Sequence, residues 1–516
     1  MKSIQKISFL LILSLLVIMA CNSSGEPDGS MSIKYNELRQ EIDGFGGSDA
    51  WARLPENPHV AAELARLLYS KKDGMGFTIL RTRIPFRERL QGDDNPGYND
   101  GFVVRNSDNT YRYTVNEDGT KTFTLNWNGW DMANSKKLID LIKSLGDDGP
   151  ENLTVFSTPW TPPNNRVTRW KENVTGVSSK LDYEIDWSKP DIWGRLRRDK
   201  YNDYADLLAD FVLNFESNMG APLNILSIQN EPNYKVEYES AYWSGEDLRD
   251  FIKTIAVRFP MKNIELDSLG IMAPEFENFD IDFNAMIKPM LDDPISENIL
   301  THIALHQYNS GYDSSVRAGS KEFPGIIASG KKFWQTEVSG SGPHLPTGNG
   351  IDNAMHYARM IHFNMTLAET NAFLFWWLWQ VNPQNQLFPG SLLMTDHSRL
   401  VDSLRLYAMG QYSRFIRPGW HRIEAAASPI RGRAVYSSAY RSPSTGEVAV
   451  VIINDTIGDY TISLDLEGAD FSRLDIWRTS AEEKLKSAGR QRVSGNKANV
   501  KIAPKSITTF YGRVKQ

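Results

Sequence analysis

The stretch LNILSIQNEP, residues 223–232, decides the fold, because it is a buried-strand sequence with a helical pattern on each side. It begins as an apolar run of strand length and ends abruptly in an amide, a carboxylate and a proline. The pattern YADLLADFVLNFE (Tyr204–Glu216) precedes it and GEDLRDFIKTIAVRF (Gly245–Phe259) follows it. A strand between two helices indicates the repeating unit of a parallel α/β fold.

Outward from this stretch, the chain repeats the same alternation of strand and helix. The sequence predicts eight strands, at Asp43–Gly47, Phe77–Ile84, Leu153–Trp160, Leu223–Gln229, Leu269–Pro274, His302–Tyr308, Lys332–Val338 and Ala372–Trp379. Eight such units predict a (β/α)8 TIM barrel. An open doubly wound sheet is the alternative, but it would usually carry a glycine-rich phosphate loop after its first strand, and GFGGS lacks that spacing.

The pattern changes after about Arg417, where short β-branched runs are separated by turn residues. These runs predict a small β-sandwich beside the barrel. Its expected strands are Gly446–Asp455, Tyr460–Leu466, Arg473–Thr479, Ala498–Pro504 and Ser506–Val514. We therefore expect a barrel that ends at residue 416 and a sandwich over residues 417–516.

The N-terminus has the pattern of a targeting segment. Two lysines precede an apolar run from Ile7 to Met19, which is short for a membrane span and typical of a secretory signal. The run ends in VIMAC, and the small Ala20 before Cys21 resembles a bacterial lipoprotein processing site. We expect residues 1–20 to be a signal peptide and residues 21–30 a flexible tether with Cys21 lipidated. A simple signal peptide with a chance cysteine is the alternative.

The composition is that of a soluble globular protein. Of 516 residues, 41% are hydrophobic and 23% charged, and the net charge is −6 with no long block of one sign. This excludes a nucleic-acid binder, which would carry a basic face. The 14 Trp, 20 Tyr and 23 Phe indicate either a large core or a cleft lined with flat faces for sugar rings. Cys21 is the only cysteine, so no internal disulfide can form.

Two glutamates end predicted strands at the same mouth of the barrel. Strand four ends at Glu231 and strand seven at Glu337, which are 337 − 231 = 106 residues apart. The C-terminal ends of barrel strands carry the chemistry, so the two carboxyl groups should meet there. Pro232 disfavours helical backbone at the residue before it, so we expect Glu231 to be extended. The motif NEP alone is weak, since any chain with 63 acidic residues places some at strand ends.

A close carboxyl pair is what glycoside hydrolysis requires, with one member protonated and the other ionised. Desolvation in an aromatic cleft and a second carboxylate both raise the pKa of an acid. A separation of about 5–5.5 Å would indicate a retaining mechanism. Arg81, in strand two, is the candidate for keeping the nucleophile ionised.

At these residues the chain resembles glycoside hydrolase family 30, and within it the xylanase-type branch, over nearly the whole mature chain. The motifs that carry the resemblance are DGFGGSDAW (Asp43–Trp51), GMGFTILRTRIPF (Gly74–Phe86), STPWTPP (Ser157–Pro163), SIQNEPNY (Ser227–Tyr234), ALHQY (Ala304–Tyr308), WQTEVSG (Trp334–Gly340) and FWWLWQVNP (Phe375–Pro383). The resemblance implies a barrel over residues 43–416 and a preceding strand, residues 31–42, that joins the side sandwich.

The resemblance also implies roles for individual residues. Glu231 is expected to be the acid/base and Glu337 the nucleophile, and no metal or organic cofactor is implied. The residues expected to contact the sugar are Arg81, Trp160, Asn230, Tyr308 and Trp377, with Asp49 and Trp51 assigned either to sugar contact or to capping and packing.

The expected activity is endo-hydrolysis of a plant or algal polysaccharide such as xylan, by a monomer lipid-anchored to a bacterial membrane. The outer membrane is favoured, with the enzyme facing the periplasm or the exterior. The alternatives are a β-1,6-galactanase, a β-1,6-glucanase, an exo-β-glucosidase, and, from another class, a non-catalytic glycan-binding lipoprotein. Glucuronoxylan-specific members of the family place an arginine just after strand eight, whereas Leu378–Phe388 contains none.

Two histidines on strand six, His302 and His306, lie four residues apart and on one face of the strand. A metal site would need a third ligand with suitable spacing, and none is evident in the sequence. The pattern therefore favours a core or sugar-site histidine. No G-x-S-x-G motif supports serine hydrolase chemistry.

Overall fold

The computed structural model describes residues 26–86, 101–107, 110–163, 195–234, 239–308, 323–340, 350–381, 390–426 and 428–515. The predicted signal peptide, residues 1–20, and the predicted lipidation site Cys21 lie outside the described residues, as does the first part of the predicted tether. Among the helices that are described, none has the length and hydropathy needed to cross a membrane.

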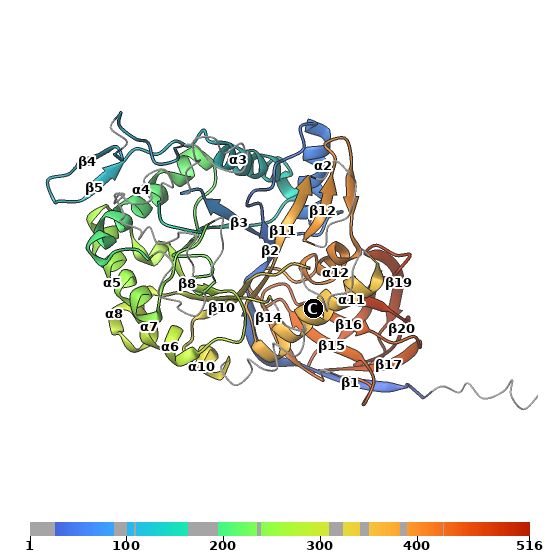
Figure 1. The fold of residues 1–516 in the computed structure, drawn as a ribbon. Coiled ribbons are helices and arrows are strands. Elements are labelled where there is room, and N and C mark those ends of the chain that lie inside the picture. Colours follow the sequence, from blue (N-terminus) through green and yellow to red (C-terminus); the bar gives the residue numbers. More distant parts are fainter. Residues whose placement is uncertain are drawn as a thin grey trace, which may run out of the picture.

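Eight parallel strands close into a barrel (Figure 1). They are β2 (Gly44–Ser48), β3 (Ile79–Ile84), β6 (Thr154–Pro159), β7 (Ile225–Ser227), β8 (Gly270–Phe276), β9 (His302–His306), β10 (Lys332–Glu337) and β11 (Ala372–Val381). Each strand pairs with the next, and β11 pairs with both β10 and β2, which closes the ring. The predicted barrel is confirmed, and each of the eight predicted segments overlaps one of its strands.

The barrel interior is divided into an apolar layer and a polar layer. Buried side chains from the first residues of the strands, including Ile79, Phe156 and Trp334, form a separate apolar cluster. Because side chains alternate along a strand, Arg81 faces the same side as Ile79 but lies closer to the C-terminal end of β3. The apolar layer therefore forms a floor beneath the polar residues of the mouth.

The helices lie outside the barrel (Figure 1). Their bounds are α2 (Pro58–Tyr69), α3 (Trp130–Lys143), α4 (Tyr201–Met219), α5 (Gly245–Met261), α6 (Phe283–Met286), α7 (Lys288–Asp292), α8 (Pro294–Ile299), α10 (Phe323–Ala328), α11 (Ile351–Phe363) and α12 (Leu404–Ser413), with short η segments at Gly146–Asp148, Arg198–Lys200, Leu266–Ser268 and Asn364–Ala368. The two helices that flank the opening stretch are α4 and α5. A capping box between Ser244 and Asp247 begins α5, and Gly220, with a φ of +79°, ends α4.

The side domain is a single nine-stranded sheet in the order β19-β18-β21-β16-β15-β14-β1-β17-β20. Its strands are β1 (Gly29–Ile42), β14 (Trp420–Ala425), β15 (Val435–Arg441), β16 (Glu447–Asn454), β17 (Tyr460–Glu467), β18 (Phe471–Thr479), β19 (Lys486–Arg492), β20 (Lys497–Ile502) and β21 (Ser506–Val514). The N-terminal strand, blue in Figure 1, lies between the orange and red strands and pairs with β14 and β17. The edge strands β19 and β20 contact each other, so the sheet curls around its own apolar core. The predicted side β-domain is confirmed, although its strands hydrogen-bond as one sheet.

Two smaller β elements extend the barrel. The strands β12 (Ser391–Thr395) and β13 (Leu400–Asp402) continue its sheet from β11. The hairpin of β4 (Tyr113–Val115) and β5 (Lys121–Phe123) is inserted between β3 and α3. The sequence did not predict these elements.

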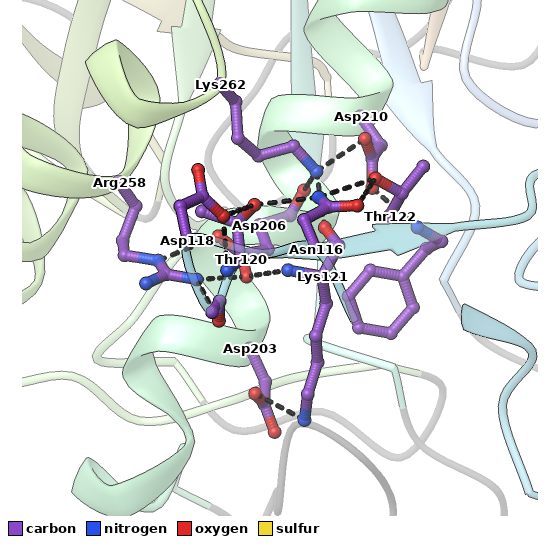
Figure 2. A network of polar contacts seen from close by, with 12 residues as sticks. Asn116, Asp118, Thr120, Lys121, Thr122, Asp203, Asp206, Asp210, Arg258 and Lys262 are labelled. Carbon is purple, nitrogen blue, oxygen red and sulfur yellow. Dashed lines mark hydrogen bonds and ion pairs between the residues drawn. The ribbon is translucent and has the colours of Figure 1, made fainter. Parts of the chain in front are cut away.

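Buried charges hold this hairpin on α4 and α5 (Figure 2). The backbone N–H of Lys121 donates to Asp206 at 2.6 Å, and that of Phe123 donates to Asp210 at 2.7 Å. From α5, Arg258 donates to Asp206 at 2.5 Å through Nη2. One helical turn later, Lys262, which caps the C-terminal end of α5, donates to Asp210 at 2.6 Å. Because each carboxylate binds the hairpin backbone and a cation at once, hairpin and helices are joined into one unit.

Candidate active site

The two predicted catalytic glutamates lie together at the C-terminal ends of the barrel strands. Glu337 ends β10, and Glu231 follows β7. One oxygen of each carboxyl group and one ring nitrogen of His306 all lie within 4.8 Å of one another. Carboxyl oxygens this close fit the short separation of retaining pairs, about 5–5.5 Å between carboxyl groups, better than the separation of about 6.5–9.5 Å in inverting pairs.

Donors bind both oxygens of the Glu337 carboxyl group. The Arg81 guanidinium donates to Oε2, and the Tyr308 hydroxyl donates to Oε1 at 2.8 Å. Burial raises the pKa of Glu337 and the charge of Glu231 adds to the rise, while His306 and Arg81 oppose it. A guanidinium can only donate, so these contacts favour Glu337 as the ionised member of the pair.

Arg81 also orients the amide of Asn230. Its Nη2 donates to Asn230 Oδ1 at 2.7 Å, and the arginine side chain has no exposed surface. The amide oxygen is therefore committed to Arg81, and the arginine fork joins strands two, four and seven of the barrel.

The backbone of Glu231 differs from the sequence expectation. Its φ is +43°, so the prediction of an extended residue before Pro232 is wrong. The Glu231 N–H donates to the carbonyl of Glu275 at 3.0 Å, and its own carbonyl accepts from the N–H of Tyr234 at 2.9 Å. These bonds close a turn at the end of β7. The proline disfavours the right-handed helical region, and the turn selects a positive φ in its place.

His306 connects the two glutamates. Its Nδ1 lies 2.9 Å from Glu231 Oε1 and 3.8 Å from Glu337 Oε1, and its side chain is fully buried. Burial lowers the pKa of His306, but the surrounding carboxylates outweigh this effect and raise it to about 9. His302 lies at the other end of β9 against Trp334, and burial lowers its pKa to about 3.

The cluster of Glu231, His306 and Glu337 contains the residue types of a metal site. A metal-bound histidine must be neutral, whereas the carboxylates around His306 hold it as an imidazolium at neutral pH. The Arg81 cation also binds Glu337. The residues therefore fit acid/base chemistry and not metal binding.

Aromatic side chains form one wall of the site. Trp160 lies 5.0 Å from Trp51 and 5.5 Å from Trp376 between ring centroids, and the Arg81 guanidinium stands 4.8 Å from the Trp160 ring. Trp377 stacks on Trp376 at 5.2 Å and donates from Nε1 to the carbonyl of Ala50. The wall thus contains the predicted Trp51, Trp160 and Trp377, together with Trp376.

Comparisons with known proteins agree with this geometry. No family model matches the chain. The glucuronoxylanase XynC of Bacillus subtilis (strain 168) is 26% identical over 486 residues, which cover 93% of this chain and 91% of the relative. The crystal structure of Xyn30A from Clostridium acetobutylicum, a glycoside hydrolase family 30 subfamily 8 xylanase, is 25% identical with a TM-score of 0.66, covering 94% of this chain and 99% of that one.

The predicted resemblance to glycoside hydrolase family 30 is therefore confirmed. The chain is accordingly an enzyme that hydrolyses glycosidic bonds. A solved endo-β-1,6-glucanase has the same fold at 18% identity and a TM-score of 0.66, covering 94% of each chain.

One predicted sugar contact of this hydrolase lies apart from the pair. The Asp49 carboxyl group is buried near Ser135 and Asp131 of α3, and burial raises its pKa to about 7. The same cluster contains Arg83, which forms ion pairs with Asp131 and Glu239. The guanidinium of Arg83 lies 4.6 Å from the Trp51 ring. Asp49 therefore belongs to a buried cluster behind Trp51.

Sequence reasoning missed two members of this site. Trp376 faces Arg81 at 5.6 Å, because the register of β11 shifts between Phe375 and Trp377 and interrupts the simple alternation. Glu275 is a fully buried carboxylate at the end of β8, one residue beyond the predicted end of that strand. The signal for Glu275 was a carboxylate directly after an apolar run, the same signal that identified Glu231.

Proposed function

We propose that this hydrolase cleaves the backbone of xylan at internal positions with retention of configuration. The observation that carries the proposal is the approach of Glu231 and Glu337 within 4.8 Å at the barrel mouth. The similarity to a glucuronoxylanase and a family 30 xylanase supports xylan as the substrate.

The proposed reaction has two displacements. Glu337 attacks the anomeric carbon while Glu231 gives its proton to the departing glycosidic oxygen, which leaves a glycosyl ester on Glu337. Glu231 then takes a proton from a water molecule, whose oxygen attacks the same carbon and releases Glu337. Arg81, Tyr308 and Asn230 hold the nucleophile and the sugar, and Trp160 and Trp377 support the sugar ring.

The catalytic assignment is tested with Glu337→Ala and Glu231→Ala. Each should lower reducing-sugar release from xylan at least about a thousandfold, since each removes a group that acts in both displacements. Azide should restore turnover of an activated aryl xyloside, giving an α-xylosyl azide with Glu337→Ala and a β-xylosyl azide with Glu231→Ala. Release by Glu337→Ala equal to wild type would contradict the assignment, and no release above background by wild type would favour a glycan-binding function.

The absence of arginine from Leu378–Phe388 favours a xylanase that does not require glucuronate side chains. Wild-type enzyme should release products of similar size from glucuronoxylan and from xylan stripped of uronic acid. The same measurement on β-1,6-galactan and β-1,6-glucan should give little release. Preferred cleavage of either of these, or release of monosaccharide alone, would replace the proposed substrate or the endo mode.

We also propose that Cys21 is lipidated and anchors the enzyme to a bacterial membrane, which the sequence VIMAC supports. In a bacterial host, wild type should incorporate a labelled fatty acid and sediment with membranes. Cys21→Ser should lose both properties and retain its activity on soluble xylan. Unchanged labelling of Cys21→Ser would contradict the anchor.

A further inference from the structure

A third carboxylate, Glu275, is buried close to the catalytic pair. It has no exposed surface, and its Oε1 lies 2.9 Å from Arg81 Nη2 and 3.6 Å from His306 Nε2. Its Oε2 accepts hydrogen bonds from Ser227 at 2.5 Å and from Thr158 at 2.8 Å. Glu275 thus contacts the same two cations that contact Glu231 and Glu337.

The charges of the two cations and the three glutamates indicate which glutamate is protonated. Arg81 and His306 supply two positive charges, and the three glutamates would supply three negative charges if all were ionised. A buried cluster is most stable near neutrality, so one glutamate should be protonated. Arg81 and two hydroxyl donors hold Glu275 as a carboxylate, and Arg81 and Tyr308 hold Glu337 as a carboxylate. The proton therefore belongs on Glu231.

This distribution depends on the charge of Glu275. Without that charge, Arg81 and His306 would be balanced by Glu231 and Glu337 with both ionised. His306 and Glu231 would then hold one proton between them instead of two. Imidazole is a stronger base than a carboxylate, so His306 would keep that proton and Glu231 would be ionised. The general acid would then lack its proton.

We propose that Glu275 is a positioning residue that keeps the proton on Glu231 by neutralising one of the two buried cations. This inference rests on the proposed function, in which Glu231 is the general acid. The same balance serves the second displacement: the ester removes the charge of Glu337 while Glu231 gives up its proton, so the cluster stays neutral. Among the described residues, the other titratable groups facing the cluster are Tyr308 and Glu277, the latter near Glu231.

The pKa of Glu275 agrees with this role. Although burial acts to raise the pKa of Glu275, Arg81, His306 and Ser227 bring it down to about 2. Glu275 is therefore ionised throughout the pH range in which a xylanase would be assayed, and its charge is a constant part of the site.

The test is the pH dependence of kcat/KM for Glu275→Gln, which has the same size without the charge. Both limbs of the profile should shift to lower pH, by about one unit or more, because removing a negative charge makes Glu231 and Glu337 easier to ionise. The loss at neutral pH should be larger for xylan than for an aryl xyloside with an acidic leaving group, which needs no proton. Glu275→Asp, which retains the charge, should keep the limbs of wild type.

Glu239→Gln is the matched control. Glu239 is also a buried glutamate paired with an arginine, Arg83, but it belongs to the cluster behind Trp51. The pH profile of kcat/KM for Glu239→Gln should have both limbs at the same pH as wild type. A folded Glu275→Gln with wild-type limbs and equal losses on both substrates would overturn the proposal.

A second measurement does not depend on the folding of Glu275→Gln. In wild-type enzyme with ¹³C-labelled glutamate carboxyl groups, one buried carboxyl signal should be protonated at pH 6 and should be lost in Glu231→Gln. A second protonated signal is expected from Glu277, whose pKa burial raises to about 7, and Glu277→Gln identifies it. If no protonated signal were lost in Glu231→Gln, the proposal would be overturned. These outcomes are distinct from failure of the proposed function, which activity of Glu231→Ala and Glu337→Ala would reveal.

Discussion

Arg81 binds three acceptors of the site. One nitrogen of its guanidinium binds Glu337, and the other binds Asn230 and Glu275. Three acceptors from three strands require a planar fork, which a lysine ammonium cannot provide. We expect Arg81→Lys to lower kcat/KM on xylan by about 10–100-fold, since losing a charge-assisted hydrogen bond costs about 1.5–3 kcal/mol.

The control for Arg81→Lys is Arg83→Lys, two residues further along β3. Arg83 also pairs with two buried carboxylates, Asp131 and Glu239, but not with the catalytic pair. We expect it to reduce thermal stability to a similar degree with a smaller loss of kcat/KM. Equal kinetic losses would mean that Arg81 acts only through folding.

The site residues that could be predicted were those that strand ends determine. Glu231, Glu337 and Arg81 follow from counting strands, because a closed barrel brings the C-terminal ends of all strands to one mouth. The positive φ of Glu231 could not be predicted, because it depends on a turn at the end of β7. The position of Trp376 against Arg81, in place of Trp377, could not be predicted either, because it depends on a register shift in β11. Such shifts arise from pairing with neighbouring strands and leave no periodic signal.

At the scale of elements, the hairpin of β4 and β5 is held by charges that reach it from two helices. Asp206 is fully buried and accepts from the N–H of Lys121 and from Arg258. We expect Asp206→Asn to lower the free energy of unfolding by about 3–5 kcal/mol, because it leaves a buried arginine without its counter-charge. Hydrogen exchange at the Lys121 amide should also accelerate.

Asp203→Asn is the matched control for the hairpin. Asp203 pairs with the Lys121 ammonium at 2.7 Å, on the same helix as Asp206 but with partly exposed side chains. A pair of this kind contributes about 0–1 kcal/mol, so the variant should change stability and exchange little. Equal effects of the two variants would show that the buried network does not hold the hairpin.

Elements with clear periodicity were predictable, and elements without it were not. All eight barrel strands follow from apolar runs between helices. By contrast, β19 has the sequence KSAGRQR with mostly exposed residues, so no apolar alternation marks it as a strand. It forms because β18 offers an open edge beside it. The hairpin is similar, since all three residues of β4 are exposed and its partner helices are distant in sequence.

At the scale of the molecule, two connections join the barrel to its side domain. The strand β1 ends at Ile42 inside the side sheet, and β2 of the barrel begins at Gly44. Helix α11 packs against β15, and α12 packs against β18 and β21. The side domain thus covers one flank of the barrel while the mouth remains formed by barrel strands and loops.

This interface contains a buried histidine that should make stability depend on pH. His362 of α11 lies 5.5 Å from the Tyr436 ring of β15, and burial together with the charge of Arg422 lowers its pKa to about 3. Between its ordinary pKa of 6.5 and about 3, the unfolded chain binds a proton that the folded chain does not. Stability is therefore lost as pH falls through this window, by about 1.4 kcal/mol per pH unit and about 2 kcal/mol at pH 5.

His362→Gln, which cannot titrate, should remove this part of the pH dependence. Thermal unfolding of wild type and variant between pH 7.5 and pH 5 should show the wild type losing more stability on acidification, whatever their difference at pH 7.5. The control is His59→Gln, because His59 is exposed on α2 and has no buried interface to disrupt. If His362→Gln and wild type lost stability in parallel, protonation of His362 would not be what weakens the interface in acid, and the buried carboxylates of the barrel would have to account for the acid sensitivity.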